Sequence, residues 1–145
     1  MVMSNELSDL LRSKGADMVG VADLRNIVPD IRYDLPFGIS IAVSLNPKIV
    51  SGIVNGPTKE YHAEYERANR LLDSLSHYAV QFLVEHGHRT RWLAATSVDI
   101  DPTTLATRLP HKTTATRAGL GWIGKTALLV TRPFGSAVRL TTVLT

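Results

Sequence analysis

The residues whose types and spacing best suit chemistry lie in one glycine-rich segment, RAGLGWIGKT, which occupies positions 117–126. Starting at Gly119, this segment matches the phosphate-loop pattern G-x-x-x-x-G-K-[ST] and also the dinucleotide pattern G-x-G-x-x-G. In both patterns the glycines let backbone N–H groups approach a phosphate, and the helix that follows directs its N-terminus at the anion. The segment therefore suggests a phosphate-bearing ligand, provided that a strand precedes it and a helix follows it.

The neighbouring residues favour the opposite order of elements. Before Gly119 the sequence TTATRA is typical of a helix. After Thr126 the sequence ALLVTRPF suits a strand, because it contains β-branched residues and because Pro133 forbids a long helix. A phosphate-loop nucleotidase, which needs a helix starting at Lys125, is therefore the less favoured alternative. The dinucleotide pattern fails in the same way, since no βαβ unit surrounds it.

Two interpretations of the glycine segment stay open on chemistry alone. In the first, three glycines within six residues expose several backbone N–H groups between Arg117 and Lys125, and this concavity suits an anionic group. Trp122 then offers an aromatic face to a planar ligand. In the second interpretation the segment is a tight turn from helix to strand, in which Gly119 ends the helix and Trp122 is buried.

The elements that must position this segment follow from the apolar periodicity. The strongest is a helix from about Thr58 to His86, in which apolar residues recur every three or four positions. Gly15 and Gly87 are expected to end a short N-terminal helix and this long one. The remaining expected elements are a helix at 112–120, strands at 16–22, 38–45, 88–96, 127–131 and 137–144, a loop at 46–57, and a hairpin or crossover loop at 132–136. The sequence thus predicts an α/β (α+β) fold, with a mixed sheet of about five strands, one long helix and two or more short ones.

Composition agrees with one ordinary globular domain spanning residues 1–145. Hydrophobic residues make up 44% and charged residues 20% of the sequence, close to the values of average folded domains. The formal net charge of +3 is too small to indicate nucleic acid by itself. The first residues do not form a secretory signal, and no apolar run approaches the ~20 residues that span a bilayer. A cytoplasmic protein without a membrane partner is therefore expected.

Two stretches of the sequence, 111–130 and 134–145, resemble the epoxyqueuosine reductases and their relatives. These proteins share an A-G-L-G-W-I-G-K signature, followed by a strand, a glycine turn and a strand that ends near V-L-T. The resemblance implies a cobalamin-binding domain related to the nitroreductase-like, cobalamin-processing and reductive-dehalogenase folds. It also implies a following ferredoxin-like domain, whose two [4Fe–4S] clusters pass electrons to the corrin cobalt. The cobalt then reduces the epoxide of a tRNA wobble nucleoside.

The resemblance also assigns candidate site residues. The glycine segment lies against the cofactor in such proteins, so the resemblance assigns Gly119, Gly121, Trp122, Ile123, Gly124 and Lys125 to the cofactor. With the flanking Arg117 and Thr126, these are the expected cofactor-binding residues. The proton donor of the family is an aspartate in a V-D-x-x-P segment, and the corresponding candidate here is Asp99. His111, whose side chain ordinarily titrates near pH ~6.5, is the alternative catalytic residue. No metal ligands are expected in these residues.

The absence of cysteine shapes the expected partners. Without cysteine, this sequence cannot ligate an iron–sulfur cluster by thiolates. We therefore expect a truncated domain, inactive alone, that works with an iron–sulfur domain or another electron donor, with tRNA as one candidate substrate. Such a domain would leave the sheet edge near 137–145 exposed, which predicts a homodimer through that edge.

Two further alternatives stay open. Flavin is the alternative to cobalamin, because both are planar rings with a phosphate-bearing tail. The alternative function is a non-catalytic binding or interaction domain that keeps the fold and has lost the chemistry.

Overall fold

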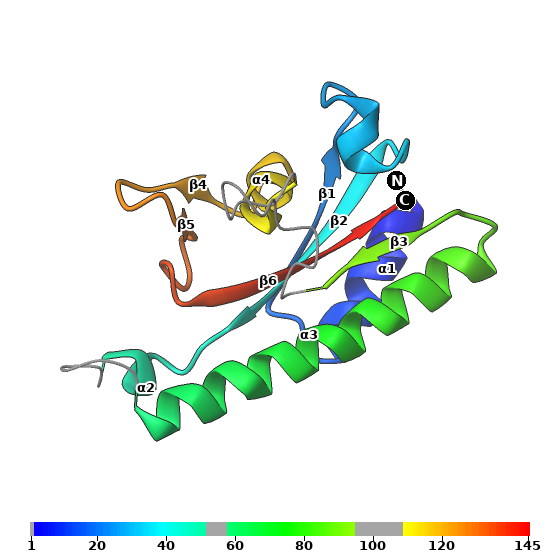
Figure 1. The fold of residues 1–145 in the computed structure, drawn as a ribbon. Coiled ribbons are helices and arrows are strands. Elements are labelled where there is room, and N and C mark those ends of the chain that lie inside the picture. The colour runs from blue at the N-terminus through cyan, green and yellow to red at the C-terminus, as the bar shows by residue number, and fades with distance from the viewer. Residues whose placement is uncertain (1, 52–57, 95–108) are drawn as a thin grey trace.

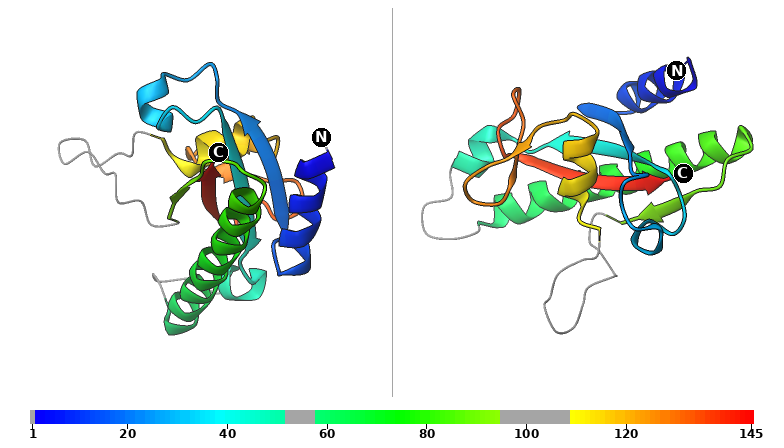
Figure 2. Two further views of the ribbon diagram at one scale, coloured as in Figure 1. Left: turned by 90° about the vertical axis from the view of Figure 1, so that its right-hand side faces the viewer. Right: turned by 90° about the horizontal axis from the view of Figure 1, so that it is seen from above.

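The computed structural model describes residues 2–51, 58–94 and 109–145, which form a four-stranded sheet with helices on both faces (Figure 1). Helices α1 (Val2–Ser13) and α3 (Lys59–Glu85) cover one face. The other face carries α4 (His111–Arg117) and a small hairpin of β4 (Trp122–Ile123) and β5 (Leu129–Val130). Figure 2 shows these layers from two further directions. The predicted α+β class is confirmed.

The strands of the main sheet follow the order β1-β2-β6-β3. Their bounds are Met18–Asp23 for β1, Phe37–Ser44 for β2, Val138–Leu144 for β6 and Arg91–Leu93 for β3. Ile41, in the middle of β2, pairs with Val19 on one side and with Thr141 on the other. All pairings among the described strands are antiparallel, so the sheet is not mixed as predicted.

Strand β6 is central, whereas the sequence predicted an exposed edge at 137–145. It lies between β2 and β3, and its last five residues up to Leu144 are all buried. A strand with neighbours on both sides offers no free row of backbone groups along the paired stretch. The predicted exposed edge is therefore wrong, and the argument for a homodimer through that edge is lost.

The core between the sheet and helices α1 and α3 explains the long apolar stripe of the sequence. Buried side chains on α3 recur at helical spacing and pack against the same face of β2 and β6; they are Ala68, Leu72, Leu75, Ala79 and Leu83. Thr58 caps the helix, since its hydroxyl accepts a hydrogen bond from the Tyr61 backbone N–H at 3.1 Å. At the other end the helix stops before Gly87, whose φ is +81°. The predicted helix is confirmed at both ends.

One short helix was missed by the sequence analysis. Helix α2 (Pro47–Ser51) lies inside the predicted loop 46–57, of which residues 52–57 are outside the described residues. The Asn46 side chain accepts a hydrogen bond from the Lys48 N–H at 3.0 Å, and Pro47 occupies the first helical position. An Asn cap followed by proline is an ordinary helix start, so the signal was present in the sequence.

A buried carboxylate fixes the start of α2 against α3. The Glu64 side chain is only 7% exposed, and it accepts hydrogen bonds from the Asn46 backbone N–H and from the Arg67 guanidinium. Arg67 also donates to the Ser44 carbonyl at 3.1 Å. The bond from Arg67 lowers the pKa of Glu64 below its ordinary value, so this carboxylate stays charged and paired.

Within the described ranges, no helix is both long enough and apolar enough to cross a membrane.

Candidate cofactor-binding site

The glycine segment begins where α4 ends. Gly119 has a φ of +79°, the left-handed conformation that commonly stops a helix. Its N–H donates to the Thr116 carbonyl at 3.1 Å, and the Leu120 N–H donates to the Ala115 carbonyl at 3.0 Å. The Gly119 amide is thus used to close the helix rather than turned toward a ligand.

The rest of the segment folds into the β4–β5 hairpin. Trp122 pairs with Val130, and the turn is closed by hydrogen bonds from Ala127 N–H to the Gly124 carbonyl at 3.1 Å and from Gly124 N–H to the Leu128 carbonyl at 2.9 Å. Lys125 and Thr126 are exposed at the tip of this turn.

This geometry corrects two predictions. No helix begins at Lys125, so the phosphate-loop nucleotidase reading is wrong. The strand predicted at 127–131 is reduced to Leu129–Val130, which is β5, and it pairs with β4 rather than with the main sheet.

One close approach fixes the shape of the hairpin, and one hydrogen bond attaches it to α4. The backbone at Gly121 passes so close to β5 that a Cβ there would lie 2.1 Å from the Val130 carbonyl oxygen. From α4, the Lys112 ammonium donates to the Ala127 carbonyl at 2.9 Å and so ties the turn to the helix. The hairpin is therefore a fixed platform, in which Gly121 is needed for backbone packing.

One surface of this platform is apolar and open, and we call it the hairpin face. Because side chains alternate across a strand and paired residues share a side, Trp122, Gly124, Leu128 and Val130 lie on the same face of the ribbon. Trp122 is 49% and Leu128 54% exposed, while Val130 is partly buried. Gly124 adds no side chain between them, which leaves the surface flat. The first interpretation of Trp122, an aromatic face open to a ligand, matches its exposure.

The other predicted cofactor residues do not join this face. Ile123 is 45% exposed on the opposite side of the ribbon, where its partner Leu129 is buried against α4. Arg117 is exposed in the last turn of α4. There it contributes, after the larger effect of Arg25, to lowering the pKa of Asp23 to about 2. The sequence prediction did not include Leu128 and Val130 in this surface. Alternation along the strand relates Trp122 to Gly124, but the two residues opposite them become known only from the strand pairing.

The candidate catalytic residue His111 lies at the first turn of α4, where both of its ring nitrogens are engaged. Nε2 lies 2.6 Å from the Ala94 carbonyl, and Nδ1 lies 2.8 Å from the Thr142 hydroxyl. Since a carbonyl only accepts, Nε2 carries the proton and Nδ1 accepts from Thr142. Burial lowers the pKa of His111, with a smaller contribution from the charge of Arg139, so the ring is neutral. Asp99, the other candidate, lies outside the described residues.

His111 belongs to a polar seam under α4, which we define as His111, Thr142, Ser40 and Thr114. Ser40 and Thr142 are direct partners across β2 and β6, and both are fully buried. The seam separates two apolar clusters, one around Leu144 and one around Leu140. Within the described part of the chain, the Ser40 and Thr114 hydroxyls have no hydrogen-bond partner. Hydroxyls on alternate strand positions carry no sequence signal, so the seam could not be predicted.

We expect Ser40→Ala to stabilise the protein by about 1 kcal/mol, because it removes a buried hydroxyl that lacks a partner. Urea unfolding at neutral pH measures the change. Thr142→Ala is the matched control, and it should destabilise by about 1–2 kcal/mol because it deprives His111 of its donor. A loss of stability in Ser40→Ala would show that its hydroxyl has a partner such as buried water.

Comparisons of sequence give no assignment. No protein-family model matches the chain, and the curated proteins give no match either.

Solved structures do match the fold. A catabolic reductive dehalogenase superposes with a TM-score of 0.74 at 14% identity, covering 95% of this chain and 20% of the dehalogenase. An epoxyqueuosine reductase crystallised with an epoxyqueuosine-modified tRNA stem loop gives a TM-score of 0.57 at 18% identity, covering 99% of this chain and 45% of the reductase. A reductive dehalogenase described with a mechanism for B12-dependent dehalogenation gives 0.61 at 16% identity, covering 95% and 18%.

These likenesses define the class of fold. The chain has an α+β fold found within epoxyqueuosine reductases and reductive dehalogenases, and the resemblance predicted from residues 111–145 is confirmed at that level. The chain spans less than half the length of the reductase and about a fifth of the dehalogenases. For this chain, the activity, substrates and partners of those longer proteins are therefore proposals.

Proposed function

We propose that this chain is the cofactor-binding domain of a cobalamin-dependent reductase and that the hairpin face meets the cofactor. The observation that carries the proposal is the open apolar surface formed by Trp122, Leu128 and Val130 around Gly124. Exposed apolar side chains gathered on a fixed platform are typical of a binding surface. The fold likeness to a B12-dependent dehalogenase supports cobalamin as the ligand.

The residues of the hairpin fit a planar cofactor. The flat face around Gly124 accepts the edge or plane of a large ring, and Trp122 adds an aromatic surface with two rotatable bonds. Lys125 at the tip supplies a cation for the phosphate of the cofactor tail. When bound, cobalamin supplies a cobalt centre that passes electrons to a substrate.

The electrons must come from outside this sequence. With no cysteine among its 145 residues, the chain cannot hold a [4Fe–4S] cluster by thiolates. We propose that residues 1–145 form a single cofactor domain and that an iron–sulfur domain or a separate electron donor completes the path. Trp122 and Leu128 are exposed enough to contact such a partner as well as the cofactor.

For the proton that a reduction requires, we propose Asp99 rather than His111. Both ring nitrogens of His111 are hydrogen-bonded inside the fold, so its proton is committed to the Ala94 carbonyl. His111 therefore acts as a positioning residue that joins α4 to β6. A tRNA stem loop carrying epoxyqueuosine, the ligand of one structural relative, is the first substrate to test.

Titration with hydroxocobalamin and with FMN, followed by absorbance and by thermal shift, tests the cofactor proposal. We expect saturable binding of hydroxocobalamin, which raises the unfolding temperature because only the folded state binds. Trp122→Ala should weaken binding about tenfold, since it removes a large stacked contact worth roughly 1 kcal/mol or more. Val84→Ala, a comparably exposed apolar residue (57%) on α3, is the matched control and should bind as the unchanged protein does.

The same titration distinguishes the alternatives. Saturation by FMN with no response to hydroxocobalamin would assign a flavin to the hairpin face. No response to either cofactor would favour the second candidate, a non-catalytic interaction domain. The observation favouring that candidate is the hairpin face itself, because an exposed tryptophan beside aliphatic residues also suits a protein partner.

A further inference from the structure

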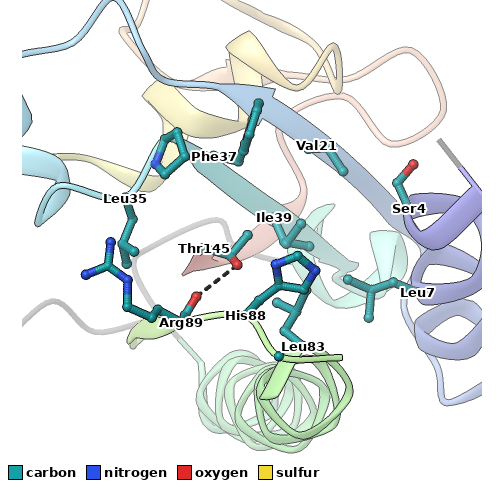
Figure 3. Close-up of a pocket in the computed structure, with 12 residues that line it drawn as sticks. Ser4, Leu7, Val21, Leu35, Phe37, Ile39, Leu83, His88, Arg89 and Thr145 are labelled. Atoms are coloured by element: carbon teal, nitrogen blue, oxygen red, sulfur yellow. Dashed lines mark hydrogen bonds between the residues drawn. The ribbon is translucent and has the colours of Figure 1, made fainter. Parts of the chain in front are cut away.

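An open cavity lies on the opposite face of the sheet from the hairpin. It has a volume of about 490 Å³ and sits between the first turns of α1, the end of α3 and the neighbouring ends of β1 and β2 (Figure 3). This volume is within the roughly 300–1,000 Å³ of small-molecule sites. The cavity exists because α1 and α3 leave this corner of the sheet uncovered, so that Val21 in β1 stays 38% exposed.

Most of the cavity wall is apolar. Helices α1 and α3, strands β1 and β2 and their flanking residues contribute to it, and the apolar side chains are Leu7, Val21, Leu35, Pro36, Phe37, Ile39 and Leu83. Several of them are core residues and almost completely buried, with Leu7 at 2% and Ile39 at 3% exposure. A rigid apolar floor of this kind takes up the hydrocarbon part of a ligand.

The polar side of the cavity carries basic side chains. His88 and Arg89 lie in the segment between α3 and β3 and both line the cavity, with the guanidinium on the Leu35 side and the imidazole on the Leu7 side (Figure 3). No acidic side chain lines the cavity, and neither His88 nor Arg89 forms an ion pair with a described residue. The Arg89 backbone is fixed by a hydrogen bond from the Thr145 hydroxyl to its carbonyl at 2.9 Å. An anionic group at this end meets the Arg89 guanidinium, which forms no ion pair with a described side-chain carboxylate.

We propose that this cavity binds an amphipathic carboxylate of medium chain length. The hydrocarbon body lies on Ile39, Phe37 and Leu83, and the carboxylate is held by Arg89 with His88 beside it. The proposal does not rest on cobalamin binding, since the hairpin face lies on the other side of the sheet.

Calorimetric titration of the full chain with decanoate, with decanol and with decyltrimethylammonium tests both halves of the proposal, the probes being used below their micelle concentrations. We expect decanoate to bind at one site and at least tenfold more tightly than decanol, with the cation weakest. Arg89→Glu should remove this preference for the carboxylate while leaving decanol binding unchanged. Arg132→Glu, an exposed arginine outside the cavity, is the matched control.

A filling variant tests the location. Val21→Trp should abolish binding of both decanoate and decanol, whereas Val84→Trp, exposed on α3 away from the cavity, should bind both normally. Both positions are exposed, so neither variant is expected to unfold the protein. Equal affinity for decanoate and decanol that Arg89→Glu leaves unchanged would overturn the proposal. So would concentration-dependent dimerisation lost in Val21→Trp, because the cavity would then be an interface between copies.

Discussion

Gly121→Ala is expected to destabilise the protein by about 3 kcal/mol, although it adds only one methyl group. That methyl would lie 2.1 Å from the carbonyl oxygen and 2.9 Å from the carbonyl carbon of Val130, and both are backbone atoms. Because backbone atoms cannot rotate away as the end of a side chain can, the chain at Gly121 must move away from β5 within the hairpin. The free energy of unfolding, from urea denaturation followed by circular dichroism, measures the loss.

Gly119→Ala is the control that separates crowding from backbone conformation. An added Cβ at Gly119 meets nothing within 4 Å, and the only cost is the left-handed φ of +79°, about 1 kcal/mol. Gly121→Ala should therefore lower the free energy of unfolding by about 2 kcal/mol more than Gly119→Ala does. Equal losses at the two positions would mean that the approach of β4 to Val130 is looser than described.

The difference matters for the cofactor proposal. If a Gly121 variant lost cobalamin binding, the cause would be a displaced hairpin and not the loss of a direct contact between Gly121 and the cofactor. Trp122 and Lys125 are exposed and free of such crowding, so substitutions there test the surface itself.

Elements with a strong local signal could be predicted from the sequence. The helix at 59–85 carries a continuous apolar stripe, a Thr cap and a glycine stop, and each acts within a few residues. Strand β2 alternates clearly and was placed within one residue at each end. Local propensity and burial agree in both elements, so no knowledge of distant contacts was needed.

Strand pairing could not be predicted, because it depends on contacts between distant residues. The apolar run after Lys125 suggested a strand joined to the last one by a hairpin or crossover loop, but β5 comprises only Leu129 and Val130, which pair with Ile123 and Trp122. The hydrogen bonds of the turn at Gly124 bring β5 back onto β4. The sequence does not reveal this turn, because its glycines have the same spacing as those of a phosphate loop. Likewise, only the register of β2 with β6 reveals that Ser40 lies beside Thr142.

For the candidate site, the sequence selected the segment on which the proposed function rests, but it did not separate residues that could contact a ligand from residues that shape the backbone. Its eight predicted cofactor residues include Trp122 and Gly124 on the hairpin face, but also Gly119 and Gly121, which serve backbone geometry. A pattern of glycines cannot distinguish a ligand contact from a close backbone approach, because both need the same missing Cβ. That distinction required the position of the Val130 carbonyl.

His111→Ala is expected to lower the stability by about 2 kcal/mol at pH 8, because it opens a cavity under α4 and leaves Thr142 without its acceptor. The loss should shrink as the pH falls. The folded protein holds His111 with a pKa below the ordinary 6.5, mainly because of burial, while the unfolded chain titrates near 6.5.

The sign of this pH dependence follows from proton binding. Below pH ~6.5 the unfolded state binds a proton that the folded state refuses, so stability falls from there down through the folded pKa. His111→Ala lacks this contribution, so its curve and that of the unchanged protein should converge in acid. Urea midpoints at pH 8, 6.5 and 5 measure the effect. A constant difference at all three values would show that His111 accepts a second proton in the folded state. His111 would then again be a candidate proton donor, as Asp99 is. Convergence of the two curves would instead mean that His111 has a structural role.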